Sequence, residues 1–217
     1  MKKSLLGAVV LAGLSLASAA SHAVVISSAT NNPYAFSWSY DTGSGLLTGN
    51  GTMTLSGFNS GVLSIAMTLN NTSPITGTGG DRLVSFGFGI DPNATGVQFV
   101  DAADAGMRSA NFVSSGALPA NVAGVEICAW GGTGCSGGAN GGILAGRSDT
   151  FTLNLSGTWG NSVNIDPIGV RYQTGRGSFT FSVPPPSANV PEPGPLALFA
   201  LGLVSLGLRR RLAPASK

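Results

Sequence analysis

Histidine is almost absent from this 217-residue sequence, and its one copy, His22, lies close to the N-terminus. Ser-His-Asp and Cys-His catalysis, and metal sites ligated by histidine, need an imidazole in the folded domain. If the segment that contains His22 is removed after export, those chemistries are excluded for the rest of the chain. Carboxylates are then the remaining candidates for catalysis.

Charged residues are also scarce, at 9% of the chain, and lysine is missing between Val24 and Val190. That stretch has five arginines and eight acidic residues, a net charge of −3. Binding to nucleic acid needs a basic surface that neutralises phosphates, so the composition excludes this class of function. Ser, Thr, Asn and Gly dominate the polar positions instead, and such a surface suits a crowded polysaccharide matrix better than a cytosol.

The N-terminus has the three parts of a secretory signal peptide. Lys2-Lys3 supplies the positive charge, an apolar run from Leu5 to Leu16 supplies the hydrophobic helix, and Ser21-His22-Ala23 has the small-x-small pattern that signal peptidase cleaves. We expect cleavage before Val24, with Ala19 as the alternative position.

The C-terminus changes character after Val183. Pro184-Pro185-Pro186 begins a linker that ends at Val190, and proline makes such a segment extended and solvated. The linker is followed by Pro191-Glu192-Pro193, an uncharged run from Gly194 to Leu208, and Arg209-Arg210-Arg211. A helix crosses a bilayer with about 20 residues, so this run of 15 predicts a short transmembrane helix. Positive charge stays on the cytoplasmic side, which puts the preceding domain outside.

The order of these C-terminal segments, from Val190 to Arg211, resembles the PEP-CTERM sorting signal. The resemblance implies recognition by exosortase, a membrane protease-transpeptidase, in a Gram-negative bacterium that makes extracellular polysaccharide. It also implies roles for two groups of residues: Pro191, Glu192 and Pro193 as the recognition motif, and Arg209, Arg210 and Arg211 as the stop-transfer charge. It says little about the middle of the chain, because the tail is attached to many unrelated domains.

Between Val24 and Val183 short runs alternate apolar and polar residues, the period of a half-buried β-strand. The clearest runs are Phe36–Tyr40, Leu63–Leu69, Val84–Ile90, Thr150–Leu155 and Phe179–Val183. Eight to ten strands with one buried face each predict an all-β fold, an antiparallel β-sandwich, of which the jelly roll is a more specific form. The stretch Ala102–Ala120 is expected to be a short helix or a long crossing loop.

Glycine, asparagine and aspartate separate these runs and favour turns. The expected breaks are Asp41-Thr42-Gly43, Gly49-Asn50-Gly51, Asn70-Asn71, Gly77–Gly80, Asp91-Pro92-Asn93 and Thr174-Gly175.

Cys128 and Cys135 are the only cysteines. Export leads through an oxidising compartment, so we expect a disulfide that closes the loop between them. A zinc site would need further thiolates or imidazoles, which the processed chain does not contain. The sequence therefore predicts no metal and no cofactor.

Carboxylates give three weak signals of chemistry. Asp41-Thr42-Gly43 matches the aspartic protease string, but that mechanism needs a second aspartate, and we expect a turn. A glycosidase needs two carboxyl groups across a cleft, and no spacing selects a pair. The candidates are Asp101, Asp104, Glu126, Asp149 and Asp166. A calcium site built from Asp101 and Asp104 is left open.

Trp130 and Trp159 lie among glycine and hydroxyl residues, where an exposed indole would suit the apolar face of a sugar. The alternative is that each folds back over the end of the sandwich.

We therefore expect an exported, non-catalytic protein, transiently anchored in the inner membrane and then delivered to the cell surface or to a biofilm or exopolysaccharide matrix. The alternative is a carbohydrate-binding module, and a carboxylate-based hydrolase is the third reading. The expected divisions are the signal peptide 1–23, the β-sandwich ectodomain 24–183, the proline-rich linker 184–190, the PEP-CTERM sorting signal 191–211 and the cytoplasmic tail 212–217.

Overall fold

A computed structural model describes residues 24–74, 80–101, 105–113, 117–118, 122–138 and 140–184. These residues form fourteen strands and no helix, so the all-β prediction is confirmed. The predicted signal helix and transmembrane helix both lie outside the described residues. In the described part of the chain, no helix has the length and hydrophobicity needed to cross a membrane.

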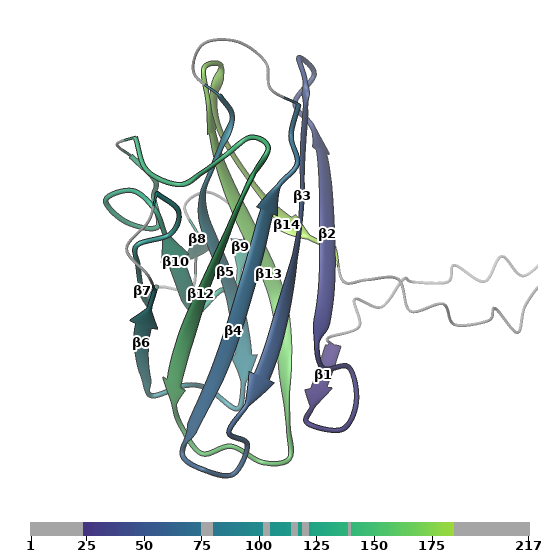
Figure 1. The fold of residues 1–217 in the computed structure, drawn as a ribbon, viewed down its shortest axis with the longest axis vertical. Helices are drawn as coiled ribbons and strands as arrows, with labels where there is room; N and C mark the ends of the chain where they lie inside the picture. The colour runs from purple at the N-terminus through teal and green to yellow at the C-terminus, as the bar shows by residue number, and fades with distance from the viewer. Residues whose placement is uncertain are drawn as a thin grey trace, which may run out of the picture.

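The strands form two large antiparallel sheets and one small one (Figure 1). Sheet A contains β1 (Val24–Ser27), β5 (Arg82–Asp91), β7 (Ser109–Phe112), β10 (Ile127–Trp130), β11 (Ile143–Leu144), β13 (Ser162–Thr174) and β14 (Gly177–Val183). Sheet B contains β2 (Tyr34–Asp41), β3 (Leu46–Ser56), β4 (Val62–Asn71), β6 (Gly96–Val100) and β12 (Arg147–Ser156). The small sheet pairs β8 (Ala117–Leu118) with β9 (Val122–Ala123).

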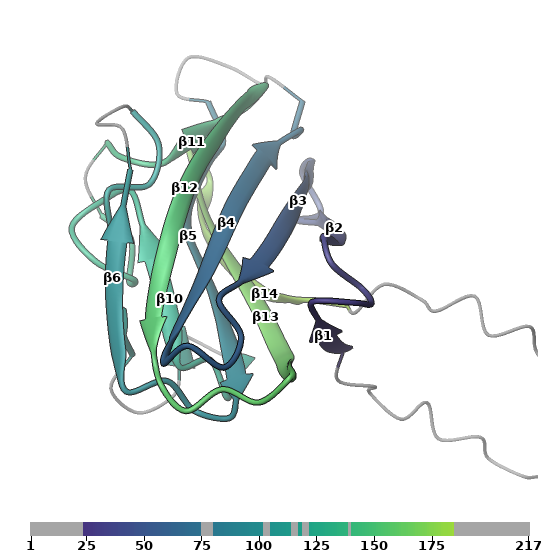
Figure 2. The same cartoon turned by 60° about the horizontal axis from the view of Figure 1, so that its bottom comes forward.

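The two large sheets lie in separate layers, and the chain crosses between them repeatedly (Figure 2). The strand order is β1-β13-β5-β10-β7 in sheet A, with β11 beside β5 and β14 beside β13, and β2-β3-β4-β12-β6 in sheet B. The chain leaves sheet A after β1, returns at β5, leaves again at β6, and later passes from β12 to β13. Two antiparallel layers connected in this way are what the sandwich prediction requires.

The inward faces of both sheets meet in one apolar core. Phe36 of sheet B contacts Phe86 of sheet A, with ring centroids 5.5 Å apart. Trp38 Nε1 of β2 donates a hydrogen bond of 3.0 Å to the Tyr172 hydroxyl of β13. Because successive side chains of a strand point to opposite faces, the alternation in the sequence directly supplies this core.

The predicted break at Gly49-Asn50-Gly51 is wrong, because these residues lie in the middle of β3. A Cβ at Gly51 would lie 2.6 Å from the Phe36 ring, and a Cβ at Gly49 would overlap the Trp38 ring. The two glycines therefore make room on the inner face for aromatic rings of the neighbouring strand β2.

The strand count and the helix alternative for Ala102–Ala120 also need correction. Fourteen strands are present among the described residues rather than eight to ten, and the additional ones are mostly short, such as β8, β9 and β11 with two residues each. In the described part of Ala102–Ala120 the chain forms strands β7 and β8, not a helix. A period of two cannot be recognised in so few residues.

Both ends of the domain lie on one edge of sheet A. In β1, Val24 pairs with Ile165, and in β14, Val183 pairs with Ile168. Since β5 lies on the other side of β13, β1 and β14 follow each other along the same edge. Three positions along a strand correspond to about 10 Å, so the domain begins and ends at nearly the same place.

Candidate functional site

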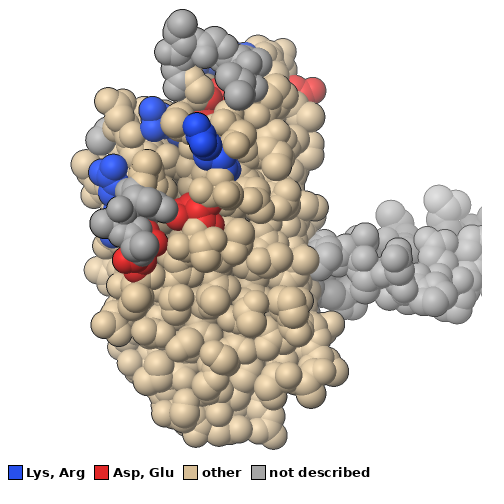
Figure 3. Space-filling view, in the orientation of Figure 1, with Lys and Arg blue, Asp and Glu red and all other residues tan. Residues whose placement is uncertain are grey.

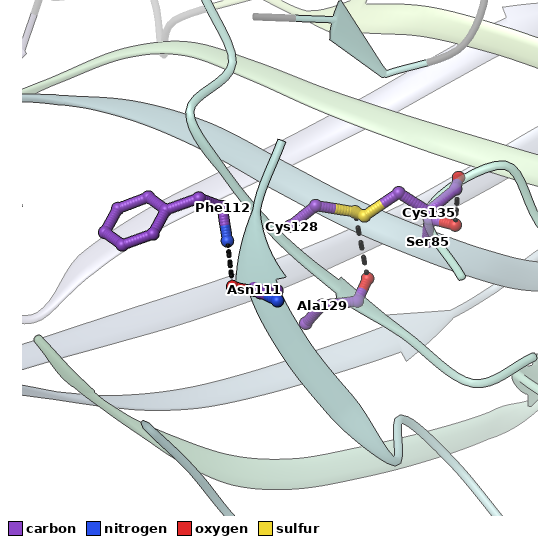
Figure 4. Close-up of a disulfide and its surroundings, with 6 residues drawn as sticks. All are labelled: Ser85, Asn111, Phe112, Cys128, Ala129 and Cys135. Carbon is purple, nitrogen blue, oxygen red and sulfur yellow. Dashed lines mark hydrogen bonds between the residues drawn. A yellow bond between two sulfur atoms is a disulfide. The ribbon is translucent and has the colours of Figure 1, made fainter. Parts of the chain in front are cut away.

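The predicted disulfide is confirmed: the Cys128 and Cys135 sulfurs are 2.00 Å apart (Figure 4). Cys128 lies in β10, and Cys135 lies in the loop that follows this strand. The Ser85 hydroxyl of β5 donates a 2.8 Å hydrogen bond to the Cys135 carbonyl. The loop is therefore held to sheet A both by the covalent bond and by the neighbouring strand.

Trp130 is the last residue of β10 and is half-buried. Its side chain packs against a small second cluster of buried residues, which consists of Leu118, Val122, Val125 and Cys128. Its carbonyl oxygen accepts a 2.8 Å hydrogen bond from the Arg108 amide. Part of the indole remains accessible, and its role in glycan binding stays a prediction.

Of the two alternatives for Trp159, the folded-back ring is confirmed, because its side chain is only 5% exposed and belongs to the main core. A Cβ at Gly157 would lie 2.6 Å from the Trp159 ring, so this glycine gives the indole its space. The flexible residues around Trp159 indicated a loop correctly. They gave no information about the direction in which the ring turns, and the buried ring offers no surface to a sugar.

The carboxylates occupy several different parts of the fold. Asp149 is buried in β12, and its Oδ2 accepts a 2.6 Å hydrogen bond from the Met107 amide. Asp101 follows β6 and is half-buried, and its suggested calcium partner Asp104 lies outside the described residues. Glu126 precedes β10, and Asp166 lies within β13 at an irregularity of the ladder. Among the described residues, no group of three or more His, Cys, Asp or Glu could hold a metal ion.

Asp41-Thr42-Gly43 forms the turn between β2 and β3, as predicted. The Gly43 amide donates to Asp41 Oδ1 at 2.8 Å, and the Thr42 amide donates to the Gly45 carbonyl at 3.0 Å. Gly43 has φ +76°, which a side chain would make unfavourable. The Asp41 carboxylate thus closes a tight turn.

The structure also contains a pocket that the sequence analysis missed, with a volume of about 420 Å³. Three arginines line it, together with small and apolar residues. Arg82 begins β5, Arg108 directly precedes β7, and Arg147 begins β12. Three arginines so far apart in the chain show no common pattern, so the sequence did not reveal the pocket. The only hint of it was the use of arginine without lysine.

Taken together, the described residues form an all-β domain with two large antiparallel sheets, one small sheet and one disulfide. Residues 189–211 match the family model of the PEP-CTERM protein-sorting motif. The predicted resemblance is confirmed, and this match contains Pro191-Glu192-Pro193 and Arg209-Arg210-Arg211, which lie outside the described residues. The motif implies export, processing by exosortase and sorting to the cell surface. No curated protein and no solved structure matches the chain.

Proposed function

We propose that this chain is a non-catalytic structural protein of the cell surface or of the extracellular matrix. The observation that carries the proposal is the PEP-CTERM motif at residues 189–211, which follows directly on a folded all-β domain and a proline-rich linker. Signal peptidase removes the N-terminal segment, the C-terminal span holds the protein in the inner membrane of a Gram-negative bacterium, and exosortase then processes the tail. The product associates with a biofilm or exopolysaccharide.

The outer face of sheet B supports a role in a hydrated matrix. The outward residues of its three central strands are uncharged and mostly carry hydroxyl or amide groups. Hydrogen bonds connect them across strands: Asn70 to Asn50 at 2.8 Å, Ser64 to Asn154 at 2.7 Å, and Thr68 to Thr150 at 3.3 Å. In Figure 3 the lower third of this face has no charged residue. Such a surface interacts with neutral sugars and water alike through hydroxyl and amide groups.

The surroundings of the carboxylates support the non-catalytic part of the proposal. Asp149 is engaged by the Met107 amide and Asp41 by a turn amide, so these two have structural roles. Among the described residues, those that line the 420 Å³ pocket include no carboxylate. A glycosidase of the usual type would need two carboxyl groups facing one cleft.

The position of the chain ends supports processing at both ends. Cleavage before Val24 would leave the described residues of β1, Val24–Ser27, in the mature chain. The linker after Val183 starts from the same edge of sheet A, as described above. Both cleavage sites can therefore face the membrane while the rest of the domain points away from it.

We also propose that the strands of the sandwich are wound as a jelly roll. Along the chain, the strands β1, β5, β10 and β13 of sheet A alternate with the strands β4, β6 and β12 of sheet B.

The sorting proposal is tested by replacing Glu192 in the recognition motif. We expect the wild-type protein to be recovered outside the inner membrane without residues 1–23 and without its C-terminal span, and Glu192→Ala to remain in the membrane fraction with the span. Intact-mass measurement of both termini in each cell fraction gives the readout. Glu126→Ala, which changes the only other glutamate, is the matched control and should be sorted normally. Recovery of the wild-type chain from the cytosol with both ends intact would refute the proposal.

A carbohydrate-binding module remains the second candidate, and it now depends on Trp130 alone. The indole is half-buried, and the Trp130 carbonyl accepts a hydrogen bond from the amide of Arg108, one of the residues that line the pocket; Trp130 itself is not among the lining residues. Binding to a glycan array that is lost in Trp130→Ala, with no change in the melting temperature, would favour this function over a purely structural one.

A further inference from the structure

We propose that the pocket lined by Arg82, Arg108 and Arg147 binds the carboxylate of an acidic sugar residue. For the source of that sugar the inference rests on the proposed association with extracellular polysaccharide. The chemistry of the pocket itself can be tested on the purified protein, whether or not the sorting proposal holds.

The distribution of charge singles out this pocket. The stretch from Val24 to Val190 has five arginines against eight acidic residues, yet three of the five line one pocket. In Figure 3 the blue atoms gather in the upper left of the face, with some red acidic atoms among them, far from its uncharged lower third. Concentrating cations in one hollow of an acidic domain creates a local positive potential that attracts anions.

The other two arginines have partners elsewhere. Arg176 forms an ion pair of 3.7 Å with Asp81 and donates to the Ser44 carbonyl at 2.6 Å. Arg171 donates to the Thr180 hydroxyl at 2.9 Å. Within the described part of the chain, the pair between Arg176 and Asp81 is the one salt bridge. The three pocket arginines therefore have no carboxylate partner among the described residues.

Two described carboxylates close to the pocket residues, Asp149 and Asp81, have partners of their own. Asp149 lies against Gly106, and its Oδ2 accepts the Met107 amide, so it fixes the segment that leads to Arg108. Asp81 precedes Arg82 in the chain, is 3% exposed and pairs with Arg176. Neither aspartate belongs to the residues that line the pocket.

The backbone around the pocket is held in place before any ligand binds. An Arg82 guanidinium nitrogen donates to the Asn140 carbonyl at 2.9 Å, which connects β5 to the loop after the disulfide. The Arg108 amide donates to the Trp130 carbonyl at 2.8 Å. Arg147 begins β12, where it pairs with Asn71. Fixing the positions of the binding groups in advance lowers the entropic cost of binding.

The lining has the mixture of groups that an acidic monosaccharide needs. An arginine guanidinium can bind both oxygens of a carboxylate through two parallel hydrogen bonds. Ile143, Leu144 and Ala105 provide apolar contact for the C–H face of a sugar ring, and Asn140 and Ser148 provide polar groups for its hydroxyls. The volume of about 420 Å³ falls within the usual range for small-ligand pockets. A bare inorganic anion would contact the arginines but would leave the apolar wall unused.

The direct test is calorimetric titration of the full-length chain in detergent with galacturonic acid, galactose, sodium phosphate and an oligogalacturonate. We expect galacturonic acid to bind at least tenfold more tightly than galactose, a difference of about 1.4 kcal/mol, because only its carboxylate can accept charge-assisted hydrogen bonds from the guanidinium groups. The oligomer should bind more tightly than the monomer, because its neighbouring uronate units stay close to the pocket when one unit dissociates and can bind in its place.

The double variant Arg108→Gln/Arg147→Gln should lose at least tenfold in affinity for galacturonic acid. Arg176→Gln removes the same kind of charge outside the pocket and should stay within twofold of the wild type. If the glutamine variant does not fold, as judged by circular dichroism, Arg108→Lys/Arg147→Lys retains the charge and loses the planar fork. We expect this lysine variant to bind at least threefold more weakly.

Two results would overturn the proposal. One is a lack of specificity for the acidic sugar: galactose binds as tightly as galacturonic acid, or phosphate does so with no gain for the oligomer, which would make the pocket a site for small inorganic anions only. The other is galacturonate binding that the pocket variants leave unchanged. A Glu192→Ala variant that is sorted like the wild type would contradict the sorting proposal but would not alter any of these affinities, so the two proposals can fail separately.

Discussion

The two sides of this domain are built differently. The long-strand side is formed by β2, β3, β4, β12, β13 and β14, which have seven to thirteen residues, and inward and outward side chains alternate along β2, β3, β4 and β12. On the loop side, residues 96–144, the described strands have two to five residues and are connected by loops. The disulfide and part of the arginine-lined pocket lie on the loop side.

The difference shows two ways of fixing a backbone. The long-strand side is ordered by packing, because aromatic rings of β2 lie over the glycines of β3. The loop side lacks enough regular pairing for this, and a covalent bond and side-chain hydrogen bonds such as Ser85 to Cys135 take its place. Binding groups are commonly located in loops held by a rigid scaffold, and the pocket follows this rule.

Of the substitutions considered, Gly49→Ala should destabilise the long-strand side the most. The new Cβ would overlap the Trp38 ring and lie 2.7 Å from the Asn70 carbonyl oxygen, so both the ring and the neighbouring strand would have to move. We expect a loss of about 3 kcal/mol in the free energy of unfolding, measured by urea denaturation. Gly175→Ala, in a turn where a Cβ meets nothing within 4 Å, is the control and should change stability little. Similar stabilities for the two variants would contradict packing as the source of order.

Cys128→Ala/Cys135→Ala should weaken the loop side by a slightly smaller amount. The closed loop is short, with a sequence separation of 7, and chain entropy predicts a loss of about 2.5 kcal/mol. The variant should also bind galacturonic acid more weakly, because Asn140 and Gly142, which follow the closed loop in the segment between β10 and β11, line the pocket. A reducing agent should destabilise the wild type by a similar amount and leave the variant unchanged. If reduction has no effect on the wild type, the loop is held by its hydrogen bonds alone.

Alkaline pH should affect the long-strand side through Tyr172. Burial raises the pKa of Tyr172 to about 12, although the hydrogen bond from Trp38 lowers it. In the unfolded chain this tyrosine ionises near pH 10, whereas in the folded chain it still holds its proton at that pH. The stability that the neutral Tyr172 contributes is therefore complete below about pH 10 and is lost as the pH rises towards about 12. The loss is on the order of 2 kcal/mol.

Tyr172→Phe removes this ionisation and so sharpens the comparison. The variant should be less stable near pH 8 by about 1 kcal/mol, because Trp38 Nε1 loses its acceptor, and its stability should fall less steeply above pH 10. Burial and the charge of Asp166 also raise the pKa of Tyr34 to about 12, so part of the slope should remain. Parallel stability curves for variant and wild type, measured by urea denaturation from pH 8 to 11, would contradict the role of Tyr172.

The sequence predicted much of the long-strand side because alternation is a local signal. Strands β2, β4, β5, β12 and β14 each contain one of the runs named from the sequence. Strand β3 was divided at Gly49 because glycine usually favours a turn, and only the position of Trp38 on the neighbouring strand explains its presence in a strand. Strand β13 was missed because Asp166-Pro167 interrupts its pattern, at the point where the register with β5 shifts.

The site was harder to predict than the fold. The disulfide followed from the presence of just two cysteines, and the turn at Asp41 followed from local chemistry. The direction of the Trp159 ring depends on contacts with the core, which no local pattern encodes. The pocket depends on the convergence of β5, β12 and the segment before β7, and such convergence can be recognised only when the strand order is known.

The neighbouring positions of Val24 and Val183 on the edge of β13 have a consequence for the topology of the chain. The backbone of the domain is almost a closed ring, with a gap that a peptide of a few residues could bridge. Circular permutants are tolerated when the two termini are close together at the surface. The order in which the strands follow one another could therefore be changed while their arrangement in space, and the pocket they form, is retained.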